Sequence, residues 1–151
     1  MSMTLFRATA VAAALFAFAL PAMAGERGTP QEAQALLDKA VKAVQEDEAK
    51  ALAAFNDPKG GYQDRDLYVF CSGPDGKTTA HRDPKMLGGD TAAIKTPDGR
   101  MVGKEIAALG QKGGGTIEYR WPNPLTNNVE TKVSFIKKAA SQVCGVGAYK
   151  E

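Results

Sequence analysis

The sequence predicts an α+β domain with an antiparallel sheet, and three observations lead to this class. An amphipathic helical pattern fills residues 30–55, two strand patterns follow at residues 66–71 and 77–81, and three more strand patterns come after a short helix. Helix and strands are segregated along the chain instead of alternating, which is typical of α+β folds. The sequence contains no internal repeat and no linker to a second domain, so we expect a single folded domain.

Residues 1–24 have the pattern of a secretory signal peptide. Arg7 precedes an apolar run, and Ala22-Met23-Ala24 forms an A-x-A cleavage site. The apolar run has about 13 residues, fewer than the roughly 20 that span a bilayer. We therefore expect cleavage after Ala24, no stable membrane insertion, and a mature periplasmic domain at residues 25–151. An uncleaved anchor is the alternative.

Charge and motifs exclude several classes of function. The chain has 19 Lys and Arg against 17 Asp and Glu, and loss of Arg7 would leave 18 against 17, a net charge of +1. This balance does not indicate a nucleic-acid partner. The sequence also lacks a Walker loop, a G-x-S-x-G elbow, an H-E-x-x-H motif and C-x-x-C spacing. We expect no catalytic residues, no cofactor and no metal site.

The helix begins with several agreeing signals. Thr29 is a good N-cap, Pro30 suits the first helical position, and Glu32 completes a capping box. Apolar residues then recur at helical spacing up to Phe55, with a polar gap at residues 46–50 that marks either a turn or a slight bend. We expect this helix to pack on the sheet; a second role in contacting a partner is the alternative.

The strand patterns differ in what they predict about the two faces of the sheet. Residues 66–71 are apolar on both faces, as in a central strand covered on both sides. In residues 116–121 the apolar side chains alternate, which places Tyr119 and Trp121 on one face. Residues 129–137 form the next strand and contain Lys132, a residue type that is seldom buried without a partner. Lys132 therefore either reaches solvent or faces an anion.

An ordered set of sequence elements resembles the single Cache domain family, in its type-2 group. The elements are Gly61-Tyr62-Gln63-Asp64-Arg65-Asp66-Leu67-Tyr68-Val69-Phe70, Asp75-Gly76, Ala80-His81, Gly103-Lys104-Glu105-Ile106, Tyr119-Arg120-Trp121-Pro122-Asn123-Pro124, Lys132-Val133-Ser134-Phe135 and Cys144-Gly145-Val146-Gly147-Ala148-Tyr149. The resemblance implies a PAS-like five-stranded antiparallel sheet, a long N-terminal helix on one face, and a small-molecule pocket on the other. It also implies extracytoplasmic sensing of small organic acids.

Six residues are candidates for lining such a pocket. Lys132 would supply a point charge, tyrosine hydroxyls would donate hydrogen bonds, and aromatic rings would form walls. The alternative is that the aromatic residues belong to a plain core and that Lys132 snorkels to water. The only histidine ends a strand beside a long loop, where it has either a structural or a ligand-contacting role. The six residues are Tyr68, Phe70, His81, Tyr119, Trp121 and Lys132.

Cys71 and Cys144 are predicted to form a disulfide. An exported chain meets an oxidising compartment, and the PAS-like arrangement makes the first and last strands neighbours. Two buried free thiols are the alternative.

The favoured function is an exported module that binds a small organic acid. Receptors of the family continue into a membrane helix and a cytoplasmic transmitter, whereas this sequence stops at Glu151. We therefore expect a module without its own transmitter, acting alone or through a membrane signalling protein. The alternative is an exported partner-binding or structural protein with no small ligand.

Overall fold

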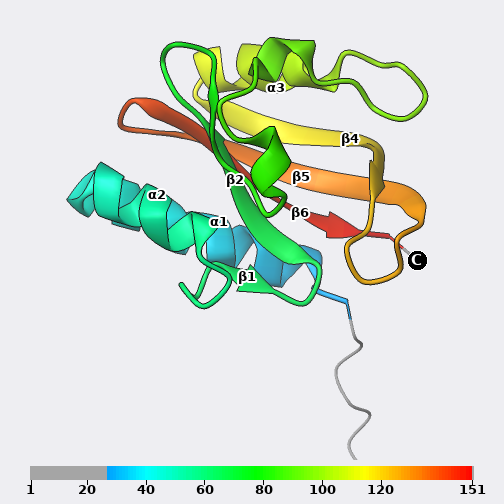
Figure 1. The fold of residues 1–151 in the computed structure, drawn as a ribbon, viewed down its shortest axis with the longest axis horizontal. Coiled ribbons are helices and arrows are strands. Elements are labelled where there is room, and N and C mark those ends of the chain that lie inside the picture. Colours follow the sequence, from blue (N-terminus) through cyan, green and yellow to red (C-terminus); the bar gives the residue numbers. More distant parts are fainter. Residues whose placement is uncertain (1–26, 151) are drawn as a thin grey trace, which may run out of the picture.

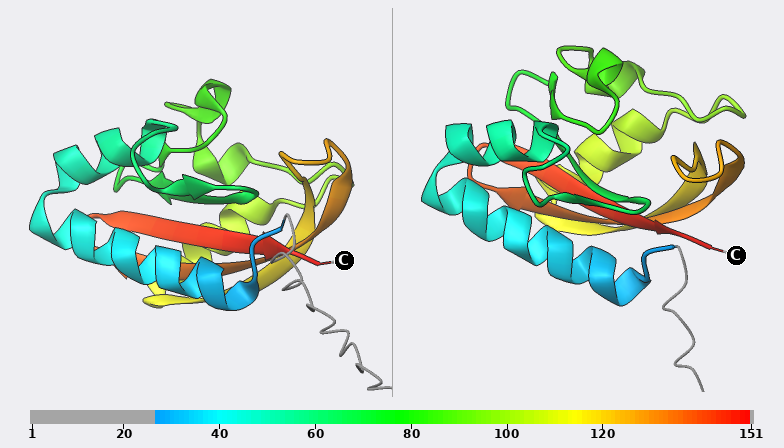
Figure 2. Two further views of the ribbon diagram at one scale, coloured as in Figure 1. Left: turned by 90° about the horizontal axis from the view of Figure 1, so that it is seen from below. Right: turned by 60° about the horizontal axis from the view of Figure 1, so that its bottom comes forward.

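The computed structural model describes residues 27–150, which form an antiparallel sheet with helices on both faces (Figures 1 and 2). The predicted signal peptide lies outside the described residues. Within residues 27–150, no helix is both long enough and apolar enough to cross a membrane.

The predicted antiparallel sheet is confirmed. Its strands are β1 (Gln63–Asp64), β2 (Leu67–Ser72), β3 (Thr78–Ala80), β4 (Gly114–Pro122), β5 (Val129–Ala139) and β6 (Gln142–Tyr149). The spatial order is β1-β2-β6-β5-β4, with β3 paired to β2, and every pairing is antiparallel. The five predicted strands are therefore present, and the two-residue β1 adds a sixth.

The predicted N-terminal helix is present but divided into α1 (Pro30–Glu46) and α2 (Glu48–Asn56). Thr29 and Glu32 form the predicted capping box. Asp47 interrupts the helix with extended backbone angles, and its side chain accepts a hydrogen bond of 3.0 Å from the Lys50 N–H. The polar gap thus marks a turn, because an aspartate at this position caps a new helix better than it continues the old one.

One face of the sheet is covered by α1 and α2. The apolar stripe of α1, including Leu37 and Val44, packs against β2, β5 and β6. Beneath it, Cys71 of β2 lies directly opposite Cys144 of β6, with 4.1 Å between their Cα atoms, and the two form the predicted disulfide.

The opposite face is covered by α3 (Val102–Gln111) and by two short 3-10 helices, η1 (Pro84–Met86) and η2 (Thr91–Ala93). Val102 and Ile106 of α3 form a second core with Ile117 and Ile136. Because β2 runs between the two cores, five of its six residues are buried, as expected of a strand covered on both sides.

Candidate functional site

The candidate site lies on the face of the sheet that is turned away from α1. In register, Tyr119 of β4 lies opposite Lys132 of β5, and Lys132 lies opposite Tyr149 of β6. Paired residues of neighbouring strands point to the same side. The rings of Tyr119 and Trp121 meet edge to face, 6.0 Å between centroids. Three strands therefore place a lysine among aromatic side chains.

An inner cavity of about 40 Å³ lies over these residues. All six of the residues predicted to line a pocket surround it, although their role in ligand binding stays a prediction. Four further residues line it that sequence reasoning missed. Val102 and Ile106 belong to α3, whereas Met86 and Ile94 come from the stretch between β3 and α3, where the sequence has no periodic pattern. The lining is Tyr68, Phe70, His81, Met86, Ile94, Val102, Ile106, Tyr119, Trp121 and Lys132.

Lys132 is the most unusual residue of the cavity, because its side chain is buried, with 1% exposure. Its Nζ lies 4.0 Å from the ring centroid of Tyr68 and 5.2 Å from that of Tyr149. Among the described residues, no carboxylate lies within ion-pair distance of it. The alternative in which Lys132 snorkels to water is therefore wrong.

The cavity nevertheless keeps Lys132 charged. Burial opposes the charge, but the neighbouring hydroxyls of Tyr68 and Tyr119 and the buried carboxylate of Asp66 outweigh this effect and raise the pKa of Lys132 above its usual value. Ring faces attract a cation as well. The cavity thus contains an ammonium group that is held by rings and hydroxyls and lacks a described ion-pair partner.

Two glycines of β6 make room for this arrangement. A Cβ atom on Gly147 would lie 2.4 Å from Cε of Lys132, and one on Gly145 would lie 2.4 Å from Cζ of Phe70. Neither distance is possible for real atoms, so the lysine stem and the phenyl ring rest directly on the glycine backbone. Alternating glycines inside a strand are a sequence signal for such close approach.

His81 faces the same cavity as a neutral ring. Its Nδ1 accepts a hydrogen bond of 2.9 Å from the Asp83 N–H, and its ring meets Tyr68 edge to face at 5.2 Å. Burial, together with the charge of Lys132, lowers the pKa of His81 to about 4. Since Nδ1 is an acceptor, the proton of the neutral ring is on Nε2, which makes Nε2 a hydrogen-bond donor.

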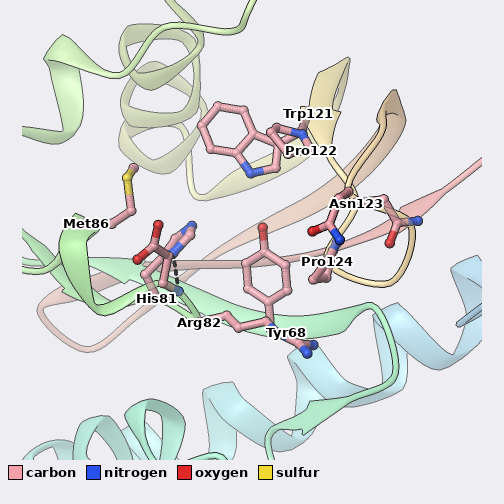
Figure 3. Close-up of a pocket in the computed structure, with 10 residues that line it drawn as sticks. Tyr68, His81, Arg82, Met86, Trp121, Pro122, Asn123 and Pro124 are labelled. Atoms are coloured by element: carbon pink, nitrogen blue, oxygen red, sulfur yellow. Dashed lines mark hydrogen bonds between the residues drawn. The ribbon is translucent and has the colours of Figure 1, made fainter.

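A larger outer pocket of about 330 Å³ adjoins the inner cavity (Figure 3). Both spaces are lined by Tyr68, His81, Met86 and Trp121, so these four side chains form the boundary between them. The other residues around the outer pocket are Arg82, Asp83, Pro122, Asn123, Pro124 and Asn127.

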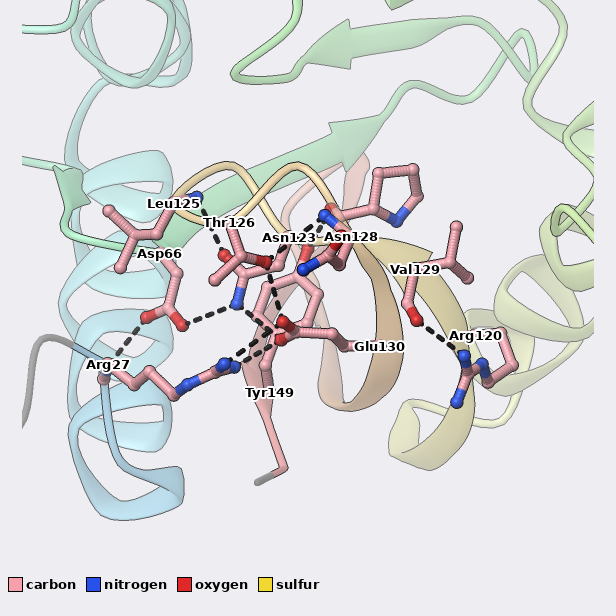
Figure 4. A network of polar contacts seen from close by, with 12 residues as sticks. Arg27, Asp66, Arg120, Asn123, Leu125, Thr126, Asn128, Val129, Glu130 and Tyr149 are labelled. Carbon is pink, nitrogen blue, oxygen red and sulfur yellow. Dashed lines mark hydrogen bonds and ion pairs between the residues drawn. The ribbon is translucent and has the colours of Figure 1, made fainter.

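A polar network fixes the wall of the outer pocket that the β4–β5 loop provides (Figure 4). Asn123 is fully buried, and its Nδ2 donates to Asp66 at 3.3 Å and to Glu130 at 2.8 Å. Asp66 also accepts from the Gly28 N–H at 2.6 Å, and Glu130 pairs with Arg27. The loop is therefore tied to the chain segment that leads into α1.

Within residues 27–150, no cluster of three or more His, Cys, Asp or Glu side chains is arranged to hold a metal ion. The polar groups that the site offers are an ammonium, a neutral imidazole and phenol hydroxyls. This set suits an organic anion.

Comparison with known proteins shows which sequences this chain is similar to. A family model described as single Cache domain 2 matches residues 21–150. The methyl-accepting chemotaxis protein McpP of Pseudomonas putida is 34% identical over 90 residues, which are 57% of this chain and 16% of McpP. The sensor histidine kinase MctS of Rhizobium johnstonii is 32% identical over 88 residues, 56% of this chain and 19% of MctS. The matched stretch is thus less than a fifth of either relative.

Solved structures show the same fold. A methyl-accepting chemotaxis protein from Vibrio parahaemolyticus is similar with a TM-score of 0.65 and 21% identity, over 79% of this chain and 86% of that one. A Cache chemosensory domain, described for its carboxylic acid recognition, has a TM-score of 0.58 and 24% identity, over 80% of this chain and 88% of that one.

Proposed function

Since the chain belongs to the single Cache domain 2 family, we propose that it is a periplasmic sensor domain that binds a small organic acid in the cavity around Lys132. One observation carries this proposal. Lys132 is a buried cation with no described carboxylate within ion-pair distance, placed in a cavity among aromatic rings. A buried charge is costly unless it is paired, so an anion that enters the cavity gains a ready partner.

The neighbouring groups suit a carboxylate. Lys132 would donate a charge-assisted hydrogen bond to one oxygen. The Nε2–H of neutral His81 and the hydroxyl of Tyr68 would donate further bonds, while Phe70 and Trp121 would contact the carbon chain. The hydroxyl of Tyr119 already lies 3.0 Å from Oγ of Ser134, so this residue would act mainly as a wall.

The relatives support a wider role in signalling. McpP is a chemotaxis protein, and MctS is a sensor histidine kinase. We infer that binding in this chain serves signalling through a chemoreceptor or a kinase. A carboxylic acid as ligand is supported by the Cache chemosensory domain that recognises such acids.

The substitution Lys132→Met tests the proposal, because methionine keeps an unbranched chain of similar volume and removes the charge. We expect calorimetry to show that affinity for the best-binding short carboxylate falls about ten- to a hundredfold, because the variant loses one charge-assisted hydrogen bond to the ligand. The unfolding free energy should stay equal or rise, since a buried charge is replaced by a hydrophobic side chain.

Lys138→Met is the matched control, because Lys138 is an exposed residue of the same strand. It should leave the affinity unchanged. If Lys132→Met binds carboxylates as tightly as the parent protein, or if no organic acid binds the parent, the proposal is wrong.

A further inference from the structure

The volumes of the two spaces limit how a ligand can sit in the site. A cavity needs about 10–15 Å³ to hold one water molecule. The inner cavity of about 40 Å³ therefore holds roughly three atoms of that size. A carboxylate group on Lys132, with its three non-hydrogen atoms, fills it. Any longer acid must extend past Tyr68, His81 and Trp121 into the outer pocket of about 330 Å³.

The outer pocket contains a second cation, Arg82. Its side chain is half-buried, and its Nη1 donates a hydrogen bond of 2.6 Å to the carbonyl oxygen of Arg65. No carboxylate of residues 27–150 lies within ion-pair distance of this guanidinium. An arginine has five N–H donors in a planar fork that matches a carboxylate, so a single bond to a carbonyl leaves most of the fork for another acceptor.

Two other polar side chains of the outer pocket, Asp83 and Asn123, are already hydrogen-bonded within the protein. Asp83 is exposed, and its Oδ1 accepts from the Lys85 N–H as the cap of η1. Both hydrogen atoms of the Asn123 amide are donated to Asp66 and Glu130. Arg82 is therefore the charged group of this pocket with the most capacity left for a ligand.

We propose that the site takes a dicarboxylic acid, with one carboxylate on Lys132 in the inner cavity and the other on Arg82 in the outer pocket. This inference rests on the proposed function, and it adds the class of acid. A monocarboxylate of the same length would place an apolar end beside the guanidinium and would gain nothing from it.

The test compares acids that differ only in the second carboxylate: succinate against butyrate, and glutarate against valerate, titrated into the full chain by calorimetry. The two lengths allow for the span between the cations. We expect at least one dicarboxylate to bind about tenfold or more tightly than its monocarboxylate partner.

Arg82→Gln should remove this preference and leave the affinities for butyrate and valerate unchanged. Arg120→Gln, at an exposed arginine outside both spaces, should change neither.

The outcomes separate this inference from the proposed function. If the parent protein binds monocarboxylates as tightly as dicarboxylates, the inference is overturned, whereas the proposed function stands. If a dicarboxylate is preferred and Arg82→Gln keeps that preference, Arg82 is not the second contact, and the inference is again overturned. If none of the four acids binds at millimolar concentration, both fail. The comparison on the parent protein needs no variant to fold.

Discussion

Lys132 and His81 face the same cavity in opposite states of charge. Lys132 is surrounded by ring faces and hydroxyls that favour an ammonium, whereas His81 receives a backbone N–H on Nδ1 and feels the positive charge of Lys132. Two cations in one largely buried cavity would repel each other strongly. The site therefore keeps one fixed positive charge and one neutral donor at the pH of most extracytoplasmic compartments.

This arrangement makes the stability of the protein depend on pH through His81. The pKa of His81 is about 4 in the folded state and about 6.5 in the unfolded chain, so the unfolded state binds the extra proton between these values. Stability must then fall as the pH decreases from 6.5 toward 4. We expect urea unfolding to show a loss of about 2 kcal/mol between pH 6.5 and 4.5.

The control for this prediction is clean because His81 is the only histidine. Ion pairing with Arg65 lowers the pKa of Glu32 to about 2, and pairing with Arg27 does the same for Glu130, so their contributions to stability are lost only below about pH 4.5. His81→Gln should therefore flatten the upper part of the profile and keep the acid limb. An equal slope in the variant would contradict the assignment.

At the scale of elements, β6 shapes the cavity because two of its residues on that face have no side chain. Gly147 and Gly145 leave the stem of Lys132 and the ring of Phe70 in contact with the strand backbone. On the other face of the same strand, Val146 and Cys144 are fully buried under α1. One strand thus alternates between filling a core and opening a site, in keeping with its two-residue period.

Gly147→Ala should act on binding through this contact. The added methyl group would overlap Cε of Lys132 and Oγ of Ser134, so the lysine must move, and we expect a destabilisation of about 1–3 kcal/mol by urea unfolding. Acid affinity should fall in the same variant. Gly145→Ala is the comparison: its methyl group meets Phe70 and Ile136, so it should destabilise similarly but weaken acid binding less. Equal affinity of Gly147→Ala and the parent would refute the packing argument.

Most elements could be predicted from the sequence because their signals are local. The capping box at Thr29, the strand alternation around Tyr119 and the turn residues each act within a few positions. The division of the helix at Asp47 was ambiguous, since a polar gap fits either a bend or a new cap. At such a position the free energies of a continued and an interrupted helix differ little, and packing on the sheet decides between them.

The site was predictable in part for the same reason. Residues on strands follow the alternation, so Tyr119 and Trp121 could be placed on one face. Met86 and Ile94 enter the cavity from a loop with no periodicity. Asn123 depends on partners 57 positions before it and seven positions after it. No local pattern encodes such contacts, because they exist only once the β4–β5 loop is folded against the segment that leads into α1.

At the scale of the whole molecule, the disulfide and the ligand cavity lie on opposite faces of one sheet. Cys71 and Cys144 belong to the core beneath α1, whereas their strand neighbours Phe70 and Gly145 face the cavity side. The bond joins β2 to β6, which are 73 positions apart in the sequence but adjacent at the centre of the sheet. It therefore closes a loop that contains most of the residues around the site.

Removing this bond should cost stability and leave binding intact. In the chain-entropy model, a loop of this length contributes roughly 4 kcal/mol by restricting the unfolded chain, and native strain usually reduces the figure. We expect the double variant with Cys71→Ala and Cys144→Ala to lose about 2–4 kcal/mol in urea unfolding. Alanine avoids a buried hydroxyl without a partner, and changing both residues avoids a free thiol. Below its unfolding transition the double variant should bind acids like the parent, because neither sulfur touches the cavity.

Thiol labelling of the denatured, unreduced parent checks the premise: two reactive thiols would show that the bond is absent. A double variant that keeps its full stability would show that the sheet, and not the disulfide, holds β2 to β6.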